Sequence, residues 1–121
     1  MKPLVLIIED DPSSAEALAL ILRDWGAEVA VVESGETVDA AVGERLKELR
    51  WVITDFHLGR DAEDGVSLVK KLRKTAPHVR VLVLSGAFHG RAVSDANSAG
   101  YEIMQKPARA EAIIAWLERA A

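Results

Sequence analysis

Short runs of apolar residues alternate along the chain with longer segments in which apolar residues recur at helical spacing. The apolar runs predict five strands, at residues 4–8, 29–32, 51–55, 79–84 and 103–104. Continuous rather than alternating apolar runs are typical of strands that are buried on both faces. Five successive strand–helix units predict an α/β protein with a parallel sheet, right-handed crossovers and helices on both faces, a three-layer α/β/α sandwich.

The segments after the first two strands predict helices. The first helix begins near Pro12 and ends at Gly26, because proline suits a helix start and glycine suits its end. A second helix begins near Ser34. Its expected buried stripe recurs at helical spacing and consists of Val38, Val42, Leu46 and Leu49.

Three further helices are expected in the rest of the chain. The third lies between Gly65 and Pro77, and the fourth, over residues 89–99, contains only small apolar residues, so we expect it to be short and weakly packed. The last helix carries the apolar stripe Ala110, Ile113, Ile114 and Leu117. Trp116 lies beside this stripe, so we expect it to be partly exposed at a partner or dimer face, with ordinary core packing as the alternative.

Composition narrows the class of protein. The 121 residues fit a single domain over 1–121, and half of them are hydrophobic, which is enough for a full core. Cysteine is absent, which excludes zinc–thiolate sites and thiol catalysis. Without a signal-like segment or a membrane-length apolar run, we expect a cytoplasmic protein that does not enter membranes. The net charge of −4 argues against direct nucleic-acid binding, and the basic residues at 70–74 are expected to form a solvated helix face.

Acidic residues follow two of the apolar runs. Glu9 and Asp10 come directly after residues 4–8, and Asp55 ends the third run. The carboxyl ends of parallel strands share one edge, where open α/β sheets build their sites, so we expect these three carboxylates to meet. Two such charges about 4 Å apart repel by about 4 kcal/mol at an effective dielectric constant near 20, so a cation is required. Oxygen ligands of this kind favour Mg²⁺. Asp11, next to Pro12, is expected to cap the following helix instead.

Two later residues are candidates for the same edge. Ser85 ends the fourth run beside Gly86, and its hydroxyl could donate to a phosphoryl oxygen, with an ordinary turn serine as the alternative. Lys106 precedes Pro107, which holds it in an extended conformation. Its ammonium group could pair with a carboxylate or a phosphoryl oxygen, with a solvated surface lysine as the alternative.

Four separated segments together resemble the receiver domain of two-component response regulators, best known from the chemotaxis response regulator. Residues 6–12 resemble the acidic-pair motif, Ile53-Thr54-Asp55 the phosphoacceptor motif, Leu84-Ser85-Gly86 the switch-hydroxyl motif and Gln105-Lys106-Pro107 the lysine–proline motif. The resemblance covers nearly the whole chain. It implies a flavodoxin-like, doubly wound sheet with strand order 2-1-3-4-5.

The resemblance also implies roles for these residues. Asp55 would accept a phosphoryl group from a histidine kinase or a histidine phosphotransfer protein. The Mg²⁺ ligands would be Glu9, Asp10, Asp55 and the backbone carbonyl of His57. Ser85 and Lys106 would bind the phosphoryl oxygens. The chain would not be an enzyme beyond its own phosphorylation and slow dephosphorylation, and its signal would be altered partner binding at the face of the fourth helix, fifth strand and fifth helix.

Two features depart from the receiver pattern. Ile103 stands where receivers usually carry an aromatic residue that moves with the switch hydroxyl, and Tyr101 is out of register with that position. The loop from Asp55 to Gly65 is longer than usual and lacks the typical proline, and together with residues 105–109 it resembles receivers attached to hybrid histidine kinases.

Two other functions remain open. The first is a receiver-like binding module in which phosphorylation switching is altered or lost. Ile103 favours this function, because it replaces the aromatic residue that usually moves with the switch hydroxyl. An aspartate-nucleophile phosphohydrolase would usually carry an acid where this chain has His57.

Overall fold

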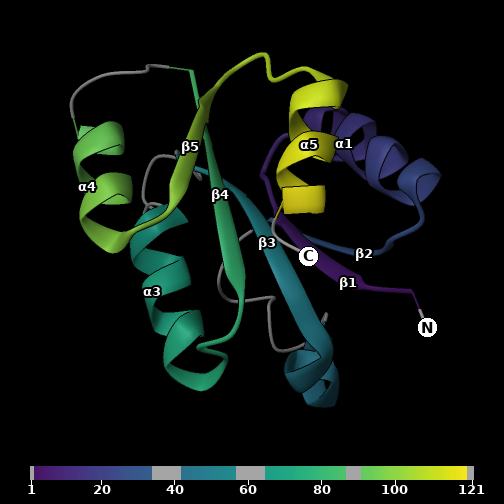
Figure 1. Cartoon of the computed structure of the whole chain (residues 1–121), viewed down its shortest axis with the longest axis horizontal. Helices are drawn as coiled ribbons and strands as arrows, with labels where there is room; N and C mark the ends of the chain where they lie inside the picture. Colours follow the sequence, from purple (N-terminus) through teal and green to yellow (C-terminus); the bar gives the residue numbers. More distant parts are fainter. Residues whose placement is uncertain (1, 34–41, 57–64, 87–90, 120–121) are drawn as a thin grey trace.

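A computed structural model describes residues 2–33, 42–56, 65–86 and 91–119 and shows a five-stranded sheet between two layers of helices (Figure 1). The strands are β1 Leu4–Ile8, β2 Glu28–Val32, β3 Leu49–Asp55, β4 Arg80–Ser85 and β5 Glu102–Gln105. Every neighbouring pair is parallel, in the order β2-β1-β3-β4-β5. The predicted flavodoxin-like architecture is confirmed.

Helices cover both faces of the sheet. They are α1 Pro12–Trp25, a short 3-10 helix Gly43–Glu48, α3 Gly65–Thr75, α4 Arg91–Ala99 and α5 Ala110–Arg119. Helices α1 and α5 pack on one face, and α3 and α4 pack on the other (Figure 1). Across the described parts of the chain, no helix combines the length and apolar character needed to cross a membrane.

The ends of α1 follow from its sequence. The Asp11 side chain accepts hydrogen bonds from the backbone N–H of Ser14 at 3.0 Å and from its hydroxyl at 2.6 Å, which confirms the predicted cap. Both bonds favour the carboxylate and lower the pKa of Asp11. At the other end Gly26 has a φ of 117°, a left-handed conformation that suits glycine, and its N–H returns to the last turn.

Burial is deepest in the central strands. All five residues of β1 are buried, and in β3 only Arg50 is exposed and only Asp55 is half-buried. The side chains of β1, β3 and β4 alternate between two apolar clusters, one beneath α3 and α4 and the other beneath α1 and α5. The two-sided burial that the continuous apolar runs predict is therefore observed.

The prediction for Leu49 is wrong. It belongs to β3 rather than to the stripe of the second helix, and it pairs with Leu4 while Trp51 pairs with Val5. This register shift leaves Arg50 without a partner residue on β1, and its guanidinium lies 5.3 Å from the centre of the Trp51 ring. A charged residue inside the run therefore concealed the start of the strand. The predicted beginning of the second helix lies outside the described residues.

The expected exposure of Trp116 is also wrong, because the residue is only 1% exposed. Helix α5 buries Ile113, Trp116 and Leu117 against the sheet, a spacing of three and four residues, and leaves Ile114 half-buried. The buried stripe is thus rotated toward Trp116. Core packing, the alternative, is what the structure shows, so this side chain offers no dimer face.

Candidate functional site

Four strands deliver the candidate residues to one edge of the sheet. Glu9 follows β1, Asp55 ends β3, Ser85 ends β4 and Lys106 follows β5. Backbone hydrogen bonds continue past the strand ends and fix this edge: Glu9 N–H donates to the Val32 carbonyl at 2.9 Å, and Lys106 N–H donates to the Ser85 carbonyl at 2.8 Å. The positions of the side chains are thus set by the sheet itself.

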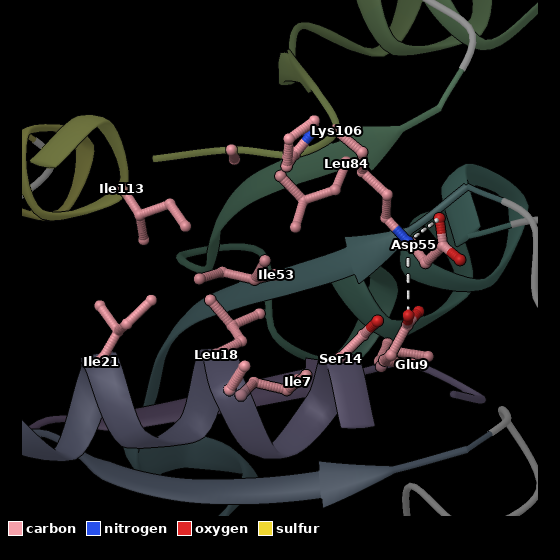
Figure 2. A pocket seen from close by; sticks show the side chains of 14 residues that line it. Ile7, Glu9, Ser14, Leu18, Ile21, Ile53, Asp55, Leu84, Lys106 and Ile113 are labelled. Atoms are coloured by element: carbon pink, nitrogen blue, oxygen red, sulfur yellow. Dashed lines mark hydrogen bonds and ion pairs between the residues drawn. The ribbon is translucent and has the colours of Figure 1, made fainter. Parts of the chain in front are cut away.

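Lys106 joins two of the acids. Its Nζ lies 3.3 Å from Glu9 Oε1 and 3.2 Å from Asp55 Oδ1. Figure 2 shows both contacts as dashed lines. Carboxylate oxygens of Glu9, Asp10 and Asp55 lie within 4.8 Å of one another. The predicted cluster therefore forms, and Lys106 is one of its members rather than a solvated lysine.

Burial and charge shift the ionisation of this cluster. Burial raises the pKa of Glu9 to about 7, and the hydrogen bond and negative charge of Asp55 act in the same direction, against the opposing effect of Lys106. Burial alone would lower the pKa of Lys106, but the charges of Asp55 and Glu9 raise it overall. Lys106 therefore stays cationic, whereas Glu9 is poised between its two forms near neutral pH.

The acids fit a divalent cation. The side chain of Glu9 is 7% exposed, and its buried Oε2 has no hydrogen-bond partner within the described parts of the chain. A buried carboxylate oxygen left in this way is costly unless a cation or donor reaches it. Three carboxylates against one ammonium leave a formal charge of −2, and a hard dication such as Mg²⁺ would cancel it.

The remaining predicted residues are placed in part. Ser85 is fully buried at the end of β4, the strand next to β3. His57 and the rest of the loop up to residue 64 lie outside the described residues.

Gly65 is a residue whose role the sequence did not reveal. Its N–H donates to the Phe56 carbonyl at 2.9 Å, and Thr54 Oγ1 donates to the Asp55 carbonyl at 2.9 Å. A Cβ on Gly65 would lie 2.5 Å from Thr54 Oγ1 and closer still to the Asp55 carbonyl oxygen. The backbone of Asp55 is therefore held by close contact with the start of α3. The available signal was a glycine at a helix start, where a capping side chain is usual.

The fold and the acidic edge define a doubly wound α/β signalling domain of the receiver class, and sequence comparison agrees. The model of the response regulator receiver domain matches residues 5–118, and the chain belongs to this family. Members act generally in phosphorylation-dependent signalling, are typically not true enzymes and generally bind Mg²⁺ at their acidic pocket.

Individual relatives support the same placement. The chain is 28% identical over 119 residues to the nitrogen assimilation regulatory protein NtrX of Azorhizobium caulinodans, covering 96% of this chain and 25% of the relative. It is 27% identical over 117 residues to the transcriptional regulatory protein ZraR of Salmonella typhimurium, covering 96% and 26%. The chain thus spans about a quarter of the length of these relatives.

A solved structure shows the same fold. The CheY-like response regulator receiver domain protein of Methanospirillum hungatei superposes with a TM-score of 0.83 at 18% identity, over 98% of this chain and 93% of that one.

Proposed function

We propose that Asp55 accepts a phosphoryl group from the phosphohistidine of a histidine kinase or a histidine phosphotransfer protein. The observation that carries this proposal is the contact of the Lys106 ammonium with the Asp55 carboxylate at a buried acidic edge. Membership of the receiver family supports a kinase as the partner. The reaction would take place in the cytoplasm, where such kinases phosphorylate their partners.

The transfer needs positioning and charge compensation more than covalent participation. An Asp55 oxygen attacks phosphorus, the bond between phosphorus and the imidazole nitrogen breaks, and its electron pair stays on that nitrogen. The imidazole leaves as a neutral base, because its other ring nitrogen already carries a proton. Lys106, already beside Asp55, would stabilise the phosphoryl oxygens, and the Ser85 hydroxyl would donate to one of them.

The metal would be held by residues of the same edge. Glu9, Asp10 and Asp55 would provide carboxylate oxygens, with the backbone carbonyl of His57 as a further ligand. When bound, Mg²⁺ supplies positive charge that neutralises the transferring phosphoryl group. The unpartnered Glu9 Oε2 supports this assignment.

The signal would leave through the α4–β5–α5 face as a change in protein binding. Lys106 follows β5 and donates its backbone N–H to Ser85, so both phosphoryl-binding side chains are linked to this face. Ile103 favours a second candidate, a binding module without a phosphorylation switch, because it lies half-buried in β5 where receivers usually carry an aromatic residue.

Intact mass after incubation with a small phosphodonor and Mg²⁺ tests the proposal. We expect one phosphoryl adduct on the chain, loss of the adduct in Asp55→Asn and its retention in Asp24→Asn, which changes an exposed aspartate of α1. An adduct that survives in Asp55→Asn contradicts the assignment of the phosphoacceptor. Absence of an adduct with every donor supports the binding module instead.

A further inference from the structure

An apolar pocket opens beside the acidic edge. Its volume is about 440 Å³, within the range of small-molecule sites, and it lies between α1, α5 and the sheet (Figure 2). Leu18 of α1, Leu84 of β4 and Ile113 of α5 form apolar walls around it. Two small residues, Ala17 on α1 and Ala108 before α5, line the same pocket. Larger side chains at these positions would fill the space, so its size follows from the sequence.

One end of this pocket is strongly polar. Glu9, Asp55 and Lys106 belong to its lining, and the three come together at the right of Figure 2, on the side opposite Ile113. The charged groups of the lining sum formally to −1, and Asp10, which lies beside Glu9 and Asp55 but outside the lining, brings the sum for the whole cluster to −2. The side chain of Glu9 is 93% buried, and its Oε2 has no hydrogen-bond partner among the described residues. Lys106 already pairs with the other Glu9 oxygen and with Asp55, so the pocket combines an apolar wall with one buried carboxylate oxygen that could still accept a hydrogen bond from a second cation.

We propose that this pocket binds an organic ammonium ion with an apolar chain, the ammonium group pairing with Glu9 and Asp55 and the chain lying between α1 and α5. An anionic amphiphile would meet a net negative charge at the polar end, and a neutral one would leave the acids uncompensated. The ligand occupies the same carboxylates as the metal, so it excludes the metal and inhibits phosphorylation. This regulatory part rests on the proposed function, whereas binding itself does not.

Titration of the full chain with n-hexylammonium, followed by methyl NMR signals of Leu18, Leu84 and Ile113, tests the binding. Ethylammonium, 1-hexanol and hexanoate are the matched probes, because the first lacks the chain, the second lacks the charge and the third carries the opposite charge. We expect hexylammonium to bind at least about tenfold more tightly than ethylammonium, the change expected when about two methylene groups leave water. It should also bind more tightly than 1-hexanol and hexanoate, because neither of these can bring a positive charge to Glu9 and Asp55. Added Mg²⁺ should raise its apparent dissociation constant.

A pocket-filling variant separates this site from the metal site. Ala17→Leu should weaken hexylammonium binding by about tenfold through steric exclusion and leave the affinity for Mg²⁺, measured without the probe, unchanged. Ala115→Leu adds the same side chain at an exposed position of α5 outside the pocket and should change neither.

Three results would overturn the proposal: hexanol or hexanoate binding as tightly as hexylammonium, signals that shift away from the pocket, or an Ala17→Leu chain that binds the probe normally. A chain that binds hexylammonium in the pocket but forms no phosphoryl adduct would instead refute the proposed function alone.

Discussion

The central strand β3 and the edge strand β5 differ in how firmly they are held. Strand β3 has seven residues, lies between β1 and β4, and buries Ile53 completely. Strand β5 has four residues, pairs only with β4 and is half-buried or exposed throughout. The phosphoacceptor candidate is therefore placed on the better packed of these two strands, while β5 and the neighbouring α4 have little apolar burial. Moving parts come from such weakly stabilised regions, so a rearrangement is expected there.

Truncating one isoleucine in each strand tests this difference most strongly. We expect Ile53→Ala to lower the free energy of unfolding by about 4 kcal/mol, because a large cavity is left in a fully buried site. Ile103→Ala should cost about half as much, since its side chain is already half-buried. Urea denaturation measures both. Equal losses of unfolding free energy would show that the edge strand β5 is packed as firmly as the central strand β3.

The strand ends can be compared with two glycines. Gly65→Ala should destabilise the chain by about 3 kcal/mol, because its Cβ would collide with the Asp55 carbonyl and Thr54. Gly86→Ala, after β4, is the matched control: no atom of the described residues lies within 4 Å of the added Cβ, so the stability should change little. Thermal unfolding of both variants provides the measurement. If Gly65→Ala leaves the stability unchanged, the backbone at the end of β3 can shift to accommodate the added Cβ at little cost in free energy.

Much of this arrangement was predictable from the sequence, for a physical reason. Residues 4–8 and 51–55 are buried on both faces, so their patterns identify strands, and parallel pairing then brings Glu9 to Asp55 without further information. The contact of Lys106 with Glu9 depends in addition on β5 pairing with β4, because Lys106 lies 97 residues away from Glu9 along the chain.

Other features could not be read from local patterns. The helical spacing of Leu49 after Val42 and Leu46 assigns it to a helix, and only the register against β1 shows that it begins a strand that contains Arg50. The position of Trp116 depended on the rotation of α5 over the sheet, which a stripe of several alternative apolar residues does not fix. The close contact of Gly65 with Asp55 arises between two elements joined by a loop, so no spacing rule predicts it.

The raised pKa of Glu9 distinguishes the acidic site at the ends of β1 and β3 from the rest of the sheet. Its pKa is about 7 in the folded chain against an ordinary value of 4.5, so the folded state holds this proton more tightly. Stability therefore falls as pH rises from about 4.5 to 7, because the unfolded chain releases the proton first. Glu9→Gln removes this loss, and we expect the variant to gain about 2 kcal/mol relative to the parent chain between pH 4 and pH 8.

Urea denaturation across this pH range, with a chelator present, measures the effect of Glu9. Glu16→Gln, which removes an exposed carboxyl of α1, controls for the change in net charge. Parallel pH profiles for the parent chain and Glu9→Gln would show that the pKa of Glu9 is the same in the folded and the unfolded chain. The site at the ends of β1 and β3 would then not raise the pKa of Glu9.

The smallest predicted effect concerns the contact between α3 and the residue that precedes the edge strand β5. The Arg73 guanidinium of α3 lies 5.6 Å from the centre of the Tyr101 ring, just before β5, and donates to the Pro77 carbonyl at 2.8 Å. Arg73→Met keeps an apolar stem but loses both interactions, at a cost of about 1 kcal/mol.

Amide exchange at Tyr101, whose N–H donates to the Ala96 carbonyl, should accelerate by about fivefold. Lys70→Met, at an exposed position of α3, should leave this rate unchanged. If Arg73→Met also leaves the exchange rate at Tyr101 unchanged, the apolar contacts of Tyr101 alone hold the start of β5. Helix α3 then does not restrain β5 through Arg73.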